Sequence, residues 1–226
     1  TRRVERLWRT FGYDRVDDVV VVFDQVRATQ AAFRKRWLLH TVHRPTVDGQ
    51  TFRVGIEREP RPGRAGGTLS ARVLLPREAL VNAAAAGLEF LVDDRNYDEE
   101  GKLAQTIRKL GPNQGEPGAW RVEVSPPEDR AEDLFLVVLL PTLGDAAASH
   151  RVRLLESAGR VGCEIVGPHR TTRWWFEPGQ LRAQIEVVTD GAPARLHRLE
   201  APAPAAAPAP EGGWLERLRA WAGPRH

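Results

Sequence analysis

A series of short β-branched segments, separated by turn-forming residues, limits the fold of this chain more than any other sequence feature. Val19–Val26 reads VVVVFDQV and is too apolar for an exposed edge strand. Lys35–His43 reads KRWLLHTVH, in which alternate residues are expected on opposite faces of a strand. Further strands are predicted at Thr51–Ile56, Thr68–Leu75, Leu88–Val92, Trp120–Ser125, Leu134–Leu140, Arg151–Glu156, Val161–Val166, Thr171–Phe176 and Leu181–Val188.

Turn chemistry lies between these segments. Pairs such as Asp48-Gly49, Gly66-Gly67, Pro178-Gly179 and Asp190-Gly191 favour reversals of the chain. Many short strands punctuated in this way are typical of an antiparallel sandwich. The pattern shows no strand–helix–strand alternation, which argues against a doubly wound or barrel α/β fold. We therefore predict an all-β chain with one antiparallel β-sandwich over residues 1–200.

Helical signals are scarce in this region. Pro76–Ala86 (PREALVNAAAA) fits a short helix with proline in its first turn and Gly87 after its end. It fits an excursion that flanks a strand equally well, and the pattern alone does not separate the two. Residues 93–118 are polar and loop-like.

The composition changes near residue 200. Ala201–Pro210 (APAPAAAPAP) favours a semi-rigid extended spacer, so residues 201–213 are predicted to be a linker. Residues 214–226 are predicted to form a short amphipathic helix with an apolar face of Trp214, Leu218 and Trp221. Because so short a helix is marginal alone, we expect it to dock on an apolar patch of this domain or of a partner. Binding to a membrane surface is the alternative.

The composition is that of a soluble globular protein. Hydrophobic residues make up 42% and charged residues 28%, which argues against a disordered chain. No apolar run approaches the ~20 residues of a membrane span. No N-terminal signal segment is evident. The chain begins at Thr1 and contains no methionine, so we expect it to be a trimmed chain or a piece of a larger one.

The numbers of cysteine and arginine residues limit the kinds of site and of binding partner further. The single Cys163 excludes an internal disulfide framework and a cysteine-rich zinc site. Only three of the 33 basic residues are lysines, and the planar guanidinium of arginine suits carboxylate and sulfate groups. Codon bias in a GC-rich genome would produce the same excess. Nucleic acid is disfavoured as a partner, because 30 acidic residues nearly balance the basic ones and no recognition motif is present.

Several of these stretches, taken in order, resemble a known family. They are VVVVFDQVRATQAAFRKRWLLHTVHRP (19–45), GRAGGTLSARVLLP (63–76), WRVEVSPPEDRAEDLFLVVLLP (120–141) and VGCEIVGP (161–168). Together they resemble the region near the C-terminus of heparinase II/III-like polysaccharide lyases, over roughly Val16 to Val188. The resemblance implies an antiparallel β-sandwich that follows an α/α toroid of the same protein, and eliminative cleavage of an acidic polysaccharide such as heparan sulfate, heparin or alginate.

The resemblance also implies which part of the enzyme carries the catalytic residues. The family's catalytic tyrosine, asparagine and arginine, and its His-x-His strand, would precede Thr1, so no catalytic residue is assigned in this chain. The chain alone is therefore predicted to be inactive, as a part that supports the toroid and lines the substrate cleft. A divalent metal would belong to the full enzyme, and none is predicted here. The family's usual location implies a periplasmic or extracellular protein. The alternative is a stand-alone domain that binds acidic glycans or partners without catalysis.

Aromatic and guanidinium groups give the candidate substrate contacts. Arg173 and Trp174, with Arg121, could form a platform on which sugar rings stack while arginine pairs with acidic substituents. Trp174 and Trp175 are adjacent in a strand, so one is expected in the core and the other on the surface. Tyr97 lies in the polar segment VDDRNYDEEG and could reach a ligand, although a plain surface loop explains it as well.

Three further residues are predicted to be structural. His40 and His43 would lie on opposite faces of a strand, which is poor geometry for a shared metal. His40 shares a face with apolar neighbours, so we expect it to be buried and hydrogen-bonded. Asp24 lies in an apolar strand and needs a partner. A hairpin centred near Gln30 would place it opposite Arg36, and Glu123 is expected to be paired in a similar way.

Overall fold

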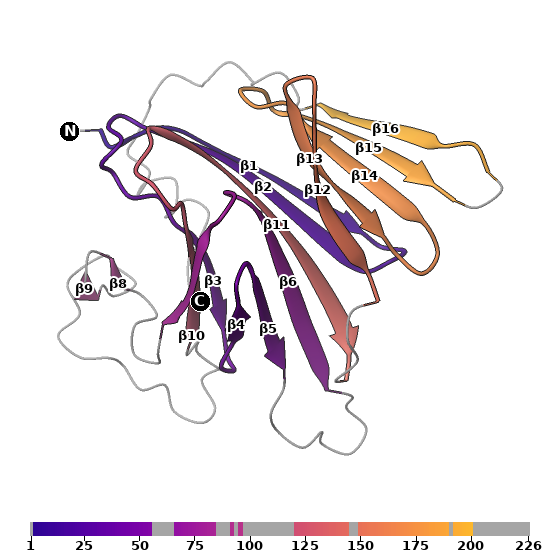
Figure 1. Cartoon of the computed structure of the whole chain (residues 1–226), viewed down its shortest axis with the longest axis horizontal. Coiled ribbons are helices and arrows are strands. Elements are labelled where there is room, and N and C mark those ends of the chain that lie inside the picture. Colours follow the sequence, from indigo (N-terminus) through magenta and orange to yellow (C-terminus); the bar gives the residue numbers. More distant parts are fainter. Residues whose placement is uncertain are drawn as a thin grey trace, which may run out of the picture.

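A computed structural model describes residues 2–55, 66–84, 91–92, 95–96, 120–144, 149–189 and 192–200. These residues form strands and connecting turns only, and every pair of hydrogen-bonded strands is antiparallel. The all-β antiparallel prediction is thus confirmed for the described part of the chain (Figure 1). No helix in that part is long and apolar enough to cross a membrane. The predicted spacer and terminal helix lie outside the described residues.

A six-stranded sheet lies at the centre of the molecule. Its order is β1-β2-β11-β6-β5-β4. The strands are β1 (Val4–Asp14), β2 (Val19–Ala28), β11 (Glu132–Leu143), β6 (Gly67–Leu75), β5 (Thr51–Gly55) and β4 (Thr46–Asp48). Five of these strands come from the first 75 residues, and β11, from the second half of the chain, inserts between β2 and β6.

Two smaller sheets pack against this central sheet. One has the order β3-β10-β7, from β3 (Trp37–Thr41), β10 (Trp120–Ser125) and β7 (Leu80–Ala84). The other is a simple meander of β12 (Arg151–Ser157), β13 (Arg160–Val166), β14 (Thr171–Phe176), β15 (Arg182–Val188) and β16 (Arg195–Glu200). A separate pair is formed by β8 (Leu91–Val92) and β9 (Arg95–Asn96).

The central sheet carries a hydrophobic core on each of its two faces. Side chains such as Phe23 and Leu136 join one core together with residues of the β12–β16 sheet. Phe135 and Val137, the intervening residues of β11, join the other core with residues of the β3–β10–β7 sheet. Consecutive residues of the central strands are therefore buried. This explains why Val19–Val26 has an apolar run in place of strict alternation.

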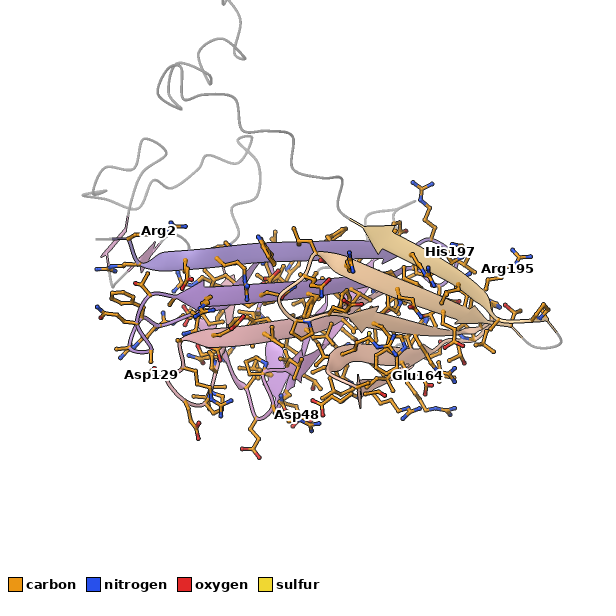
Figure 2. All side chains as sticks on the ribbon, turned by 90° about the horizontal axis from the view of Figure 1, so that it is seen from above. Arg2, Asp48, Asp129, Glu164, Arg195 and His197 are labelled. Atoms are coloured by element: carbon orange, nitrogen blue, oxygen red, sulfur yellow. The ribbon has the colours of Figure 1, made fainter. Side chains whose placement is uncertain are left out.

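A close backbone approach joins β1 to the meander. A Cβ atom at Gly12 would lie 2.3 Å from Cζ3 of Trp174, far inside any normal contact distance. Glycine is therefore required where β1 crosses the indole ring. Figure 2 shows the side chains of these strands as sticks, seen from above.

The alternative of a helix at Pro76–Ala86 is wrong for the described residues. Pro76–Glu78 turns the chain, and Leu80–Ala84 then forms β7, which pairs with β10. Alanine favours a helix, but the alanines of this segment belong to a strand at the edge of a sheet. That sheet covers a hydrophobic core, and its packing overrides the helical preference of the residues. The expectations also missed β1, β4 and β16.

Candidate functional site

The outer face of the β12–β16 sheet gathers most of the charged groups of the meander. Cys163, Trp174 and Phe176 point inward, because they belong to the core against the central sheet. Residues that alternate with them along each strand point outward. The strand register aligns the outward residues in rows that cross the sheet.

The first row is a chain of ion pairs, which we call the ion-pair row. Arg153 Nε donates to Glu164 Oε1 at 2.6 Å, and Arg173 Nε donates to Glu164 Oε2 at 2.8 Å. Arg173 Nη1 also donates to Glu186 Oε2 at 3.1 Å. Glu164, labelled in Figure 2, is buried between its two arginines. Each charge of this row has an opposite charge beside it, so the row stabilises the sheet and leaves little net charge for a ligand.

The pKa values in the ion-pair row follow from these contacts. The hydrogen bond from Arg153, with that from Arg173, lowers the pKa of Glu164, although burial opposes the shift. The hydrogen bond to Glu164 likewise raises the pKa of Arg173. The two arginines therefore favour the ionised form of Glu164, as expected for a structural cross-strand ladder.

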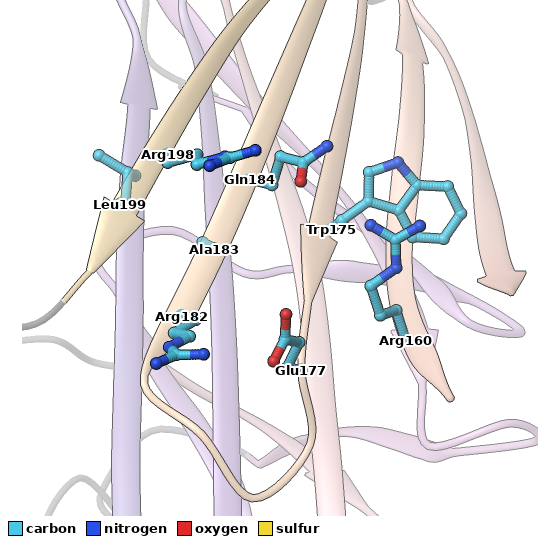
Figure 3. A pocket seen from close by; sticks show the side chains of 8 residues that line it. All are labelled: Arg160, Trp175, Glu177, Arg182, Ala183, Gln184, Arg198 and Leu199. Atoms are coloured by element: carbon cyan, nitrogen blue, oxygen red, sulfur yellow. The ribbon is translucent and has the colours of Figure 1, made fainter. Parts of the chain in front are cut away.

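The next two rows form an open pocket of about 260 Å³, which we call the tryptophan pocket. Trp175 lies opposite Gly162 on β13 and Gln184 on β15, and Arg198 of β16 continues this row. Figure 3 shows the side chains that line the pocket, which are Arg160, Trp175, Glu177, Arg182, Ala183, Gln184, Arg198 and Leu199.

Among the described residues that line the tryptophan pocket, positive charges outnumber negative ones. Three arginines line it together with one carboxylate, Glu177. Arg182 and Arg198 are exposed and make no ion pair with any side chain that the structure describes. Arg160 lies with its Cζ 4.9 Å from the centroid of the Trp175 ring. Guanidinium groups beside an indole form a surface suited to a sugar that carries a carboxylate or sulfate.

A buried amide holds one wall of the pocket. Gln25 of β2 is almost completely buried, and its Nε2 donates to the carbonyl of Gln180 at 2.8 Å. Its Oε1 accepts the backbone N–H of Gly179 at 2.6 Å. These bonds fix the turn between β14 and β15, and this turn separates Glu177 from Arg182. The central sheet therefore positions two of the residues that line the pocket.

The described residues offer little for catalysis. No group of three or more His, Cys, Asp or Glu side chains among them could hold a metal ion. Cys163 is fully buried, and burial raises the pKa of its thiol far above the usual range. A thiol in that state is a poor nucleophile.

The residues predicted to contact the substrate do not line the tryptophan pocket in the described structure. Trp174 is wrong as a surface contact: only 4% of it is exposed, and its Nε1 donates to Thr172 Oγ1 at 3.2 Å in the core. The neighbouring Trp175 faces the pocket instead, because alternate residues of β14 point to opposite faces. Arg173 belongs to the ion-pair row. Arg121 is buried on β10 and pairs with Glu123, so it is not on the surface. Tyr97 lies outside the described residues.

The predicted structural residues also need correction. Asp24 is buried as expected, but its partner is Arg9, whose Nε and Nη2 donate to the two carboxylate oxygens at 2.7 and 2.6 Å. The hairpin with Arg36 does not form, because β2 pairs with β1 and β11 while β3 belongs to another sheet. Arg36 lies 3.5 Å from Glu123 instead. His40 is exposed, because Trp37 and Thr41 are the residues that β3 buries.

Sequence reasoning missed Arg160, Arg182 and Arg198. The sequence pattern contained a signal for Arg160 and Arg182. Alternation along predicted strands places Arg160 on the face opposite Cys163, and Arg182 on the face opposite Ala183. Arg198 could not be found, because β16 was not predicted. Comparison with family models and with curated proteins found no match for this chain.

Proposed function

We propose that this chain is a non-catalytic β-rich module that binds acidic polysaccharide through the tryptophan pocket. The single observation that carries the proposal is the contrast in charge on one face of the sheet. The arginines of the ion-pair row are neutralised by Glu164 and Glu186, whereas Arg182 and Arg198 have no ion-pair partner among the described side chains. Unpaired guanidinium groups pair readily with the carboxylates and sulfates of a glycan.

The indole supplies the second part of the recognition. Trp175 is half-buried, so its ring is held in place by the sheet while part of it stays accessible. An apolar ring face next to charged groups matches a pyranose, which has an apolar face and acidic substituents at its edge. Gln184 adds amide donors and acceptors for hydroxyl groups on the same side of the pocket.

The sequence resemblance gives this binding a context. In our proposal residues 1–200 are the C-terminal sandwich region of a heparinase II/III-like polysaccharide lyase that works outside the cytoplasm. An upstream α/α toroid would then carry out β-elimination, while the pocket holds the polysaccharide beside the cleft. The stand-alone binding domain uses the same pocket. The two contexts differ in the coding sequence upstream of Thr1, where the lyase requires several hundred residues with the periodicity of a helical toroid.

Calorimetric titration of the chain with size-matched oligosaccharides tests the binding. We expect heparan sulfate and alginate oligosaccharides to bind, with an affinity that falls as salt is added, because the contacts are charged and solvent-exposed. A neutral glucan of the same length should bind at least about tenfold more weakly, which corresponds to about 1.4 kcal/mol. Equal affinities for acidic and neutral oligosaccharides would contradict the proposal.

A lyase assay on the same preparation tests the absence of catalysis. Eliminative cleavage produces an unsaturated uronate that absorbs ultraviolet light, and we expect no sustained product from any of these substrates. Acid, base and carboxylate-neutralising groups must converge on one sugar for elimination, and the described residues do not provide that set. Sustained product formation would mean that the chain contains catalytic residues that this account has not identified.

A further inference from the structure

The position of Arg160 over Trp175 has a consequence for which sugars can enter the tryptophan pocket. The Arg160 guanidinium lies over the indole, with its Cζ 4.9 Å from the ring centroid (Figure 3). It thus occupies space that a stacked sugar ring would need. A ligand that uses this part of the indole must first displace the guanidinium.

The local backbone fixes Arg160 at this place. A two-residue turn of Ala158 and Gly159 joins β12 to β13, and both residues have positive φ angles, 50° and 76°. This is the signature of a tight type I′ hairpin turn, whose twist matches that of the flanking strands. Arg160 is the first residue of β13 and pairs with Ser157. Its Cα therefore has little freedom, and only the side chain can move.

Arg160 is not paired with Glu177, the one carboxylate among the described residues that line the pocket. It forms no ion pair in the described structure, and the Trp175 ring is its one partner that the structure records. The situation of Arg6 is different, because Arg6 lies over Trp8 and is also paired with Glu132. Displacing Arg160 therefore costs the contact with the indole, and the guanidinium needs a new partner, either Glu177 or an anionic group of the ligand.

We propose that Arg160 makes the tryptophan pocket selective for acidic over neutral sugars. This inference rests on the proposed function of the pocket and names its ligand class, a sugar with a carboxylate or sulfate on the ring that stacks. An acidic sugar replaces the indole as the partner of Arg160 and forms charge-assisted hydrogen bonds, which are stronger than those between neutral groups. A neutral sugar displaces the same guanidinium and offers no such bonds itself, so it recovers less of the lost cation–π contact than an acidic sugar does.

The test compares one acidic oligosaccharide with its own neutral form. An oligouronate and the carboxyl-reduced oligosaccharide made from it have the same length and linkage and differ only in charge. Both are titrated by calorimetry into the wild-type chain, R160A, R160K and R182Q. We expect R160A to bind the oligouronate more weakly and the reduced oligosaccharide more tightly, so that the ratio of the two affinities falls by about tenfold. R160K should retain part of the ratio, because it keeps the charge without the planar fork.

R182Q is the matched control, because it removes one arginine of the pocket that does not lie over the ring. It should weaken oligouronate binding and leave the affinity for the reduced oligosaccharide unchanged. Melting temperatures of all variants establish that each is folded. Arg160 is half-buried and makes no ion pair in the described structure, so we expect the melting temperatures to differ little. If R160A does not bind the reduced oligosaccharide more tightly than the wild type and R182Q do, the inference is overturned while the proposed function stands. If the wild-type chain binds no oligouronate, the proposed function itself is wrong and the inference falls with it.

Discussion

The ion-pair row and the tryptophan pocket lie side by side on one face of one sheet, yet their arginines are in opposite situations. In the ion-pair row Arg153 and Arg173 share the carboxylate of Glu164, and Glu186 completes the chain of charges. In the pocket Arg182 and Arg198 have no ion-pair partner among the described side chains. Counting arginines therefore does not locate a binding site. What matters is which arginines the fold has already neutralised.

The largest expected effect comes from the glycine between the two regions. A Cβ at Gly162 would lie 1.9 Å from the backbone oxygen of Trp174, so alanine cannot fit without separating β13 from β14. We expect Gly162→Ala to lower the free energy of unfolding by about 3 kcal/mol or more and to weaken glycan binding as well. Urea unfolding and the rate at which Cys163 reacts with a thiol reagent measure the change.

Gly55→Ala is the control for this substitution. A Cβ there would meet only Thr68 Oγ1 at 3.7 Å, an ordinary contact, in another sheet. It should leave glycan affinity and Cys163 reactivity as in the wild type. If Gly162→Ala were as stable as Gly55→Ala, the close approach of β13 and β14 would be wrong.

Gln25→Leu should damage the pocket while sparing the ion-pair row. The substitution leaves the N–H of Gly179 and the carbonyl of Gln180 without their buried partner. We expect a loss of about 1–3 kcal/mol in stability, together with weaker oligouronate binding, because the turn before Arg182 is no longer fixed. Urea unfolding and calorimetry measure the two effects. Unchanged glycan affinity in a destabilised variant would show that this turn does not position the pocket.

Glu164→Gln should leave the arginines of the ion-pair row without their shared carboxylate, so that they resemble the arginines of the tryptophan pocket. It removes the carboxylate that holds Arg153 and Arg173, so we expect a stability loss of about 1–2 kcal/mol. The two arginines then face solvent without their shared partner, and affinity for a polyanion should rise about twofold to threefold. Calorimetry at low and moderate salt measures the gain. A loss of affinity would mean that the ion-pair row itself contacts the glycan.

The Glu164 carboxylate also makes the stability that the ion-pair row contributes depend on pH. The pKa of Glu164 is lower in the folded state than in the unfolded state, where it is about 4.3. The contribution of Glu164 to the free energy of unfolding is therefore fully present above about pH 4.3, and it is lost as the pH falls through the pKa of the folded state. Unfolding free energies measured from pH 6 downward should therefore fall less steeply for Glu164→Gln than for the wild type. Parallel curves would contradict the assigned role of Glu164.

The sequence predicted the class of fold better than the site, for physical reasons. Alternation in Thr171–Phe176 showed that Trp174 and Trp175 point to opposite faces, but not which face another sheet would cover. His40 was misplaced for the same reason. The strand β1 was missed because VERLWRTFGYD mixes charged and apolar residues on a strand that pairs on only one side. Asp24 clearly needed a partner, but its identity as Arg9 depends on that missed strand.

The most direct test compares one arginine from each region. Arg198→Gln and Arg153→Gln remove the same charge from the same face of the sheet, and both side chains are exposed. Calorimetric titration with one acidic oligosaccharide, at fixed salt, gives the affinity of each variant. We predict that Arg198→Gln weakens binding by about tenfold and that Arg153→Gln stays within about twofold of the wild type. Equal losses in the two variants, or a larger loss for Arg153→Gln, would contradict it.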